Sequence, residues 1–117
     1  MIELKQGEII MYKNIEKNQI LKLNDEISYQ KGQVVSKTLV QNDTFSMTIF
    51  AFDENEEIAT HKTSGDAMVI LIDGEGKFTV GEDVHMLKNG ETLIMPKDIP
   101  HSVFASKQFK MLLIISY

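Results

Sequence analysis

Two histidines, His61 and His101, are the residues of this sequence best suited to chemistry. Neutral imidazole binds transition metals well, so we expect the pair to hold one divalent ion, either Zn, Fe, Ni, Mn or Cu. A stable site normally takes three protein ligands and keeps a position open for water or substrate. Asp66 is the nearest carboxylate in sequence and is our candidate third ligand, although Ser64-Gly65-Asp66 is more typical of a turn. The alternative is that both histidines line a polar pocket that binds a small molecule without metal.

The sequence patterns around the remaining histidine and three methionines favour structural roles. His85 lies in the segment Gly81–Gly90, where polar and apolar residues alternate. This pattern predicts an exposed strand residue rather than a ligand. Met68, Met95 and Met111 are suited to an adaptable apolar lining, because methionine fills irregular cavities. They are consistent with a pocket for a partly apolar ligand, although core filling is the usual role of such residues.

The composition excludes several classes of protein. Without cysteine there are no disulfides, thiolate metal sites or cysteine nucleophiles. The net charge of −5 and the absence of arginine argue against nucleic-acid binding. Acidic residues interrupt MIELKQGEII, so it does not form a signal peptide, and the longest apolar run, Met68–Ile72, is too short to span a bilayer. We therefore expect a cytoplasmic protein that does not bind membranes.

The pattern along the chain is one of short strands separated by turns. A length of 117 residues fits one domain, 1–117, with an N-terminal arm over about 1–25 and a barrel over about 33–117. Only residues 14–26 could hold a turn or two of helix. Predicted strands are Val34–Val40, Phe45–Phe52, Ala67–Ile72, Lys77–Val80, Glu91–Met95, His101–Ala105 and Lys110–Ser116, with turn-forming residues, Asp73-Gly74 among them, in between. Recurring turns without helical periodicity are typical of an all-β sandwich or barrel.

The run from Gly90 to His101, GETLIMPKDIPH, carries a recognisable motif. It resembles the second motif of the cupin superfamily, in which a glycine, five residues, a proline and a short turn precede a ligand histidine. Asp98 stands where that motif usually has glycine, and Ala105 stands where it usually has asparagine. The family also has a first motif, earlier in the chain, that usually begins with a glycine, and Asn55 occupies that position.

The run from His61 to Gly76, HKTSGDAMVILIDGEG, resembles the first cupin motif. The family usually supplies a histidine, a second histidine two residues later, a glutamate, and a glycine turn seven residues after the glutamate. His61 fills the first position and Gly74 the glycine turn. The second histidine is replaced by Thr63 and the glutamate by Ala67.

The resemblance implies a fold and a site. The fold is all-β, a small antiparallel jelly-roll β-barrel with a short N-terminal arm and little helix. The barrel is expected to bring His61 and His101 together at one end of its pocket. They are the two retained ligands of a site that usually has three histidines and one glutamate. We expect Thr63, Ala67 and Met95 to line the same pocket.

Two classes of function fit these observations. The first is a metal-dependent protein that acts on a small organic molecule, with the ion polarising a carbonyl or enol oxygen. The second is a non-catalytic, metal-free module that binds a small effector as a sensor or accessory subunit. In either case we expect a homodimer, since cupins commonly form dimers. The last strand, Met111–Ile115, is apolar on both faces, and an isolated barrel would leave one face in water.

Overall fold

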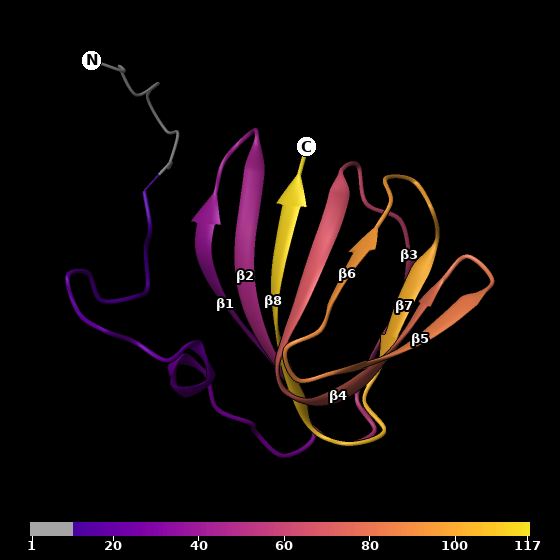
Figure 1. Ribbon diagram of the computed structural model, residues 1–117, viewed down its shortest axis with the longest axis horizontal. Helices are drawn as coiled ribbons and strands as arrows, with labels where there is room; N and C mark the ends of the chain where they lie inside the picture. The colour runs from indigo at the N-terminus through magenta and orange to yellow at the C-terminus, as the bar shows by residue number, and fades with distance from the viewer. Residues whose placement is uncertain (1–10) are drawn as a thin grey trace.

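A computed structural model describes residues 11–117 of the chain (Figure 1). The start of the predicted arm, and the expectation that MIELKQGEII is not a signal peptide, lie outside these residues. Within residues 11–117, no helix is long and apolar enough to cross a membrane. The elements in chain order are η1 (Leu23–Glu26), β1 (Val34–Gln41), β2 (Phe45–Phe52), β3 (Glu57–His61), β4 (Asp66–Val80), β5 (Asp83–Lys88), β6 (Thr92–Met95), β7 (His101–Phe104) and β8 (Phe109–Ser116).

The strands form one antiparallel sheet that curls around a central core (Figure 1). The strand order is β1-β2-β8-β4-β7-β3, and β5 and β6 also pair with β4. The long strand β4 therefore pairs with four other strands. Its first part pairs with β8 and β6, and its last part pairs with β5 and β7. The prediction of a small antiparallel β-barrel with little helix is confirmed, since η1 is a single short turn.

Two strands differ from the sequence prediction. Ala67–Ile72 and Lys77–Val80 were expected to be separate strands around a turn, but they form one strand, β4. Gly74 has a φ of +73°, next to a register shift between Leu71 and Asp73, so the strand bends there without ending. The second difference is β3, which the sequence patterns did not predict. The strand β5 was expected only from the alternating residues around His85.

The inner face of the sheet carries the main core. Alternating apolar residues of β2, β4, β7 and β8 meet there, as expected for strands with one face buried. At the end of the barrel where β8 begins, the ring of Phe109 stacks on Phe52 at a centroid distance of 4.5 Å. The ring of Phe78 packs edge-on against Phe109 at 5.8 Å. All three rings are fully buried and form part of the main core.

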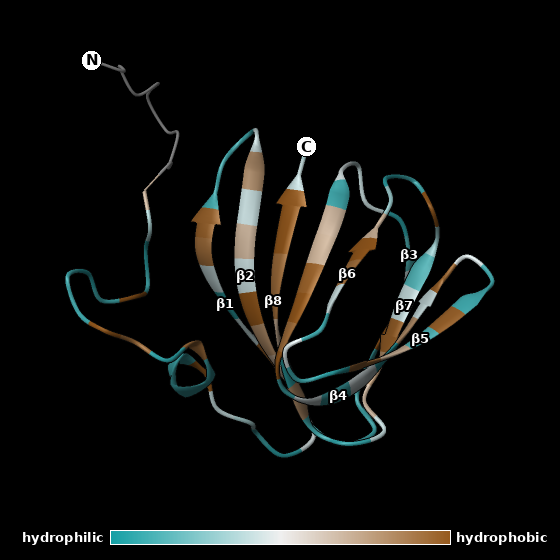
Figure 2. Ribbon diagram, viewed as in Figure 1, coloured by the Kyte–Doolittle hydropathy of each residue, from teal (hydrophilic) through white to brown (hydrophobic). Residues whose placement is uncertain are grey.

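A second apolar cluster lies on the outer face of the sheet, where the N-terminal arm packs. Ile27 of the arm is buried with Ile49 and Leu112, and Ile15 and Leu23 pack against them. Figure 2 shows β8 hydrophobic over most of its length, which contains the run Met111–Ile115. The expectation that one face of this strand would be left in water by a single chain is wrong at Leu112, because the arm covers it.

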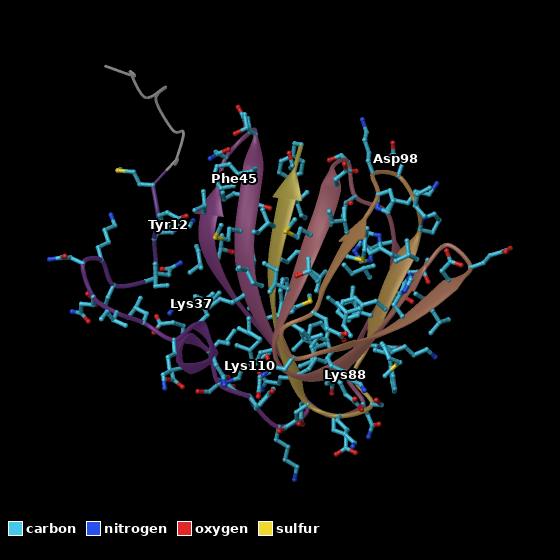
Figure 3. All side chains as sticks on the ribbon, viewed as in Figure 1. Tyr12, Lys37, Phe45, Lys88, Asp98 and Lys110 are labelled. Carbon is cyan, nitrogen blue, oxygen red and sulfur yellow. The ribbon has the colours of Figure 1, made fainter. Side chains whose placement is uncertain are left out.

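Polar contacts from two lysines fasten the arm to the sheet. Lys110 of β8 is buried, and its Nζ donates to the backbone oxygen of Asn24 at 2.7 Å and to Asn24 Oδ1 at 2.8 Å. The same ammonium lies 4.9 Å from the centre of the Tyr29 ring. Lys37 of β1 reaches Glu26 Oε1 at 3.3 Å. Figure 3 labels both lysines, beside the turn of η1.

Replacing Lys110 by methionine should loosen the arm. The variant keeps the length of the side chain but removes two charge-assisted hydrogen bonds to Asn24, so we expect a loss of about 1–2 kcal/mol in the free energy of unfolding. Limited proteolysis should also cleave the arm faster. Lys107→Met, at an exposed loop position, is the matched control. Equal stability and equal cleavage in the two variants would contradict this role for Lys110.

Candidate functional site

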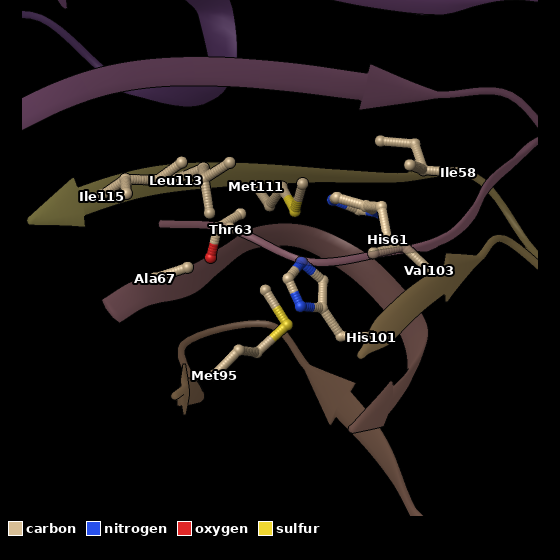
Figure 4. A pocket seen from close by; sticks show the side chains of 10 residues that line it. All are labelled: Ile58, His61, Thr63, Ala67, Met95, His101, Val103, Met111, Leu113 and Ile115. Atoms are coloured by element: carbon tan, nitrogen blue, oxygen red, sulfur yellow. The ribbon is translucent and has the colours of Figure 1, made fainter. Parts of the chain in front are cut away.

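A pocket lies between the strands β3, β4, β6, β7 and β8 (Figure 4). Its volume is about 70 Å³, small compared with the roughly 300–1,000 Å³ of pockets for drug-sized ligands. A ligand here is therefore a small one. The lining residues come from six segments of the barrel and are Ile58, His61, Thr63, Ala67, Met95, His101, Val103, Met111, Leu113 and Ile115.

His61 and His101 meet in this pocket because their strands are neighbours. β3 pairs with β7, and the two histidines are direct partners across that pair. Their ring centroids are 4.2 Å apart with an interplanar angle of 65°. His101 is buried, with 2% of its surface exposed, whereas His61 lies at the exposed rim. The expected juxtaposition of the two imidazoles is thus present in the structure.

Backbone carbonyls set the tautomer of both rings. Nδ1 of His61 lies 2.9 Å from the oxygen of Ala59, and Nδ1 of His101 lies 3.1 Å from the oxygen of Ile99. A carbonyl oxygen only accepts, so in each neutral ring Nδ1 carries the proton and donates it. Nε2 of each ring then has a free lone pair. Metal-ligating histidines typically show this arrangement.

The environment of His101 favours its neutral form. Burial lowers the pKa of His101, and the nearby positive charge of a protonated His61 lowers it too, whereas the bond to the Ile99 carbonyl raises it. The balance is a pKa below the ordinary value for histidine. At neutral pH the lone pair of His101 is therefore available for a ligand.

Asp66 does not join the two histidines. Its side chain is exposed, and its Oδ1 accepts a hydrogen bond from the backbone N–H of Lys97 at 2.8 Å. The physical reason is strand alternation, because the next residue, Ala67, points into the pocket. Within residues 11–117 no group of three or more His, Asp or Glu could share an ion. His85 also lies elsewhere, half-buried on β5 opposite Phe78.

The other predicted lining residues, Thr63, Ala67 and Met95, do line the pocket. Thr63 donates its hydroxyl proton to the oxygen of Gly65 at 2.8 Å, which leaves only oxygen lone pairs for a ligand.

The three methionines divide between the two faces of the sheet. Met95 and Met111 line the pocket. Met68 lies on the outer face of β4, opposite Ile94 and Ile114. The pocket lining therefore includes two of the three methionines that the sequence made candidates for it.

Sequence reasoning missed four lining residues. Leu113 and Ile115 share the strand face of Met111, so alternation along β8 would have found them. Val103 follows from His101 by the same rule. Ile58 could not be found in this way, because β3 was not predicted.

Two departures from the cupin motifs keep the backbone that the motifs require. Asn55 has a φ of +69° and Asp98 a φ of +62°, both in the left-handed region that glycine adopts easily. Asparagine and aspartate tolerate this region better than other residues with a side chain. The Asp98 N–H donates to the oxygen of Thr63 at 3.0 Å, which ties the loop before His101 to the loop after His61. The substitutions thus preserve the turns beside the site.

A comparison with known protein families identifies the chain. Residues 48–116, which include both histidines, match the sequence profile of the cupin domain family. The chain is a cupin. No curated protein is significantly similar to it.

Solved structures of other bacterial proteins share the fold of this cupin. A conserved protein of unknown function from Streptococcus pyogenes is 35% identical, with a TM-score of 0.88 over 91% of this chain and 93% of that one. A cupin superfamily protein from Desulfitobacterium hafniense is 27% identical, with a TM-score of 0.86 over 90% and 96% of the two chains. A cupin 2 conserved barrel domain protein from Leptotrichia buccalis is 41% identical, with a TM-score of 0.81. That alignment covers 83% of this cupin and 47% of the longer protein.

Proposed function

We propose that this cupin binds one transition-metal ion through His61 and His101 and uses it on a small organic molecule. One observation carries the proposal. Both Nδ1 atoms donate to backbone carbonyls, so both Nε2 atoms have free lone pairs beside one small pocket. A metal-free ligand pocket has no general need for this orientation, whereas a metal site does.

The residues present fit an ion with an incomplete protein ligand set. Two neutral imidazoles supply nitrogen donors, and positions remain for water or substrate. A bound ion would act as a Lewis acid that polarises a carbonyl or enol oxygen, which suits an isomerisation or a two-electron oxidation. The protein's own contribution is to fix the two rings, hold His101 neutral and surround the substrate with apolar side chains.

A metal-free binding module is the second candidate. It is favoured by the lining, which apart from the two histidines and Thr63 is apolar. In that case the Nε2 atoms would accept hydrogen bonds from a small effector, and the protein would act as a sensor or accessory subunit. Such a ligand would need donor groups, because an Nε2 atom whose ring is protonated at Nδ1 can only accept.

Metal content separates the two candidates. The protein, purified without a histidine tag, is analysed for bound elements as isolated and after incubation with Zn, Fe, Ni, Mn or Cu. The proposal predicts a stoichiometric ion. Protein that is isolated without metal and takes up none of these ions would leave the metal-free module as the surviving candidate.

We further propose that two copies of the chain pair through the outer face of the sheet, in the cytoplasm. Beyond the arm, Met68, Ile70 and Ile114 are only partly buried, and Ile94 is 53% exposed. Apolar surface of this kind is unfavourable in water and is covered by a second, identical surface in a symmetric dimer.

Light scattering at micromolar concentration should therefore give twice the chain mass of 13.3 kDa. Ile94→Lys should reduce that mass to one chain, because a lysine in the centre of an apolar interface loses its hydration. Ser106→Lys, at an exposed position in the loop between β7 and β8, adds the same single charge and is the control. A clean monomer for the unaltered protein would refute the dimer.

A further inference from the structure

The pocket contains two sulfur donors as well as two nitrogen donors. Met95 of β6 and Met111 of β8 line the same small cavity as His61 and His101. Figure 4 shows both thioether side chains directed into the pocket around the ring of His101. Met95, Met111 and His101 are each 2% exposed, so these donors are shielded from bulk water.

This donor set is soft and uncharged. Thioethers are poor ligands for Zn, Fe and Mn but good ligands for monovalent copper, and imidazole binds copper as well. Among residues 11–117, no carboxylate lines the pocket to neutralise a divalent ion. Placing two positive charges among neutral ligands in an apolar cavity costs more than placing one. The chemistry of the lining therefore favours a soft ion of charge +1.

The position of the donors also suits a single ion. They come from four different strands, β3, β6, β7 and β8, that surround one end of the barrel. Four donors arranged in this way can approach an ion from different directions, as low-coordinate or tetrahedral copper requires. By contrast, Met68 faces the outside of the sheet and cannot contribute.

We propose that the pocket is a monovalent copper site with His61, His101, Met95 and Met111 as ligands. This inference rests on the proposed metal site at the two histidines. It assigns the ion and places the two thioethers in positions that water would otherwise fill, so a substrate would have to displace one of them. The ordinary role of the methionines is apolar packing. Leucine fills nearly the same volume without a sulfur donor, so Met→Leu variants separate the two roles.

The test is an anaerobic competition between the purified protein and a chromophoric Cu(I) chelator, bicinchoninate. We expect one Cu(I) per chain and a loss of affinity of ~10–100-fold in Met95→Leu and in Met111→Leu, as for other groups that hold a metal in place. Met68→Leu is the matched control and should leave the affinity unchanged. X-ray absorption of the copper-loaded protein should show sulfur as well as nitrogen neighbours, with fewer sulfurs in each pocket variant.

The outcomes distinguish this inference from the function on which it rests. Binding of Zn(II) or Ni(II) through the histidines, with Cu(I) affinity unchanged by Met95→Leu and Met111→Leu, would overturn the copper site and leave the two-histidine site standing. Failure of Cu(I) and of every divalent ion to bind would overturn both. Selective Cu(I) binding that both methionines and both histidines strengthen supports both.

Discussion

Replacing His61 or His101 by alanine is expected to reduce the metal content from about one ion per chain to near zero, since either change removes one of the two imidazole donors that line the pocket. The two rings face one another across β3 and β7 at a centroid distance of 4.2 Å. Neither ring has a nearby histidine or carboxylate that could replace the other within residues 11–117. Elemental analysis of variants loaded under identical conditions measures the effect.

The two variants differ in their risk to the fold. His101 is buried, so His101→Ala leaves a cavity and its circular dichroism and melting temperature must be compared with those of the parent. His61 is exposed and its replacement should leave stability nearly unchanged. His85→Ala, on β5 away from the pocket, should keep full metal content. A folded His61→Ala protein that binds metal as well as the parent would exclude the two-histidine site.

Gly74→Ala is expected to lower the free energy of unfolding strongly, by about 2 kcal/mol or more. Gly74 has a φ of +73°, where a Cβ is unfavourable, and a Cβ at this position would also meet the backbone oxygen of Gln108. Backbone on the opposite side cannot move aside as a flexible side chain could. Urea unfolding followed by circular dichroism measures the loss.

Gly32→Ala is the matched control for Gly74→Ala. Gly32 has a similar φ of +70°, but a Cβ added there would meet no atom within 4 Å. Gly32→Ala should therefore lower the free energy of unfolding by only about 1 kcal/mol, the cost of the positive φ for a residue with a Cβ. Equal losses in the two variants would show that the close approach of Gln108 to Gly74 does not matter. The comparison bears on the site, because β4 carries Ala67 before the bend and pairs with His101 after it.

The sequence was informative about the fold because alternation and turn residues mark strands directly. Seven strand segments were predicted, and β7 begins at His101, as the predicted strand His101–Ala105 does. A glycine within a strand pattern does not show whether the strand ends or only bends there. Gly74 allows either a turn or a bend within a strand, and only the partner strands β7 and β8 decide between them.

The site was predictable in part. The motif resemblance pointed to His61 and His101, and to Thr63 in the place of the second histidine. β3 was missed because its five residues contain one strongly apolar side chain, Ile58, and most of the strand is exposed. The role of Asp66 depended on whether Asp66 or Ala67 faces inward, which the turn before them concealed.

The orientation of the two imidazoles could not be predicted from sequence at all. It depends on the backbone oxygens of Ala59 and Ile99, each two residues before its histidine, and on ring rotation within the folded barrel. The covering of Leu112 by the N-terminal arm likewise depends on contacts between distant residues, such as Lys110 with Asn24. Local patterns carry no signal for either feature.

Two-bond ¹H–¹⁵N correlation spectra of the histidine side chains test the central claim most directly. They report which ring nitrogen carries the proton and which one binds a metal. We predict that His61 and His101 have protonated Nδ1 and free Nε2 atoms in the metal-free protein, and that both Nε2 signals shift on addition of metal while those of His85 do not. Rings protonated at Nε2, or spectra of His61 and His101 that metal leaves unchanged, would contradict the account.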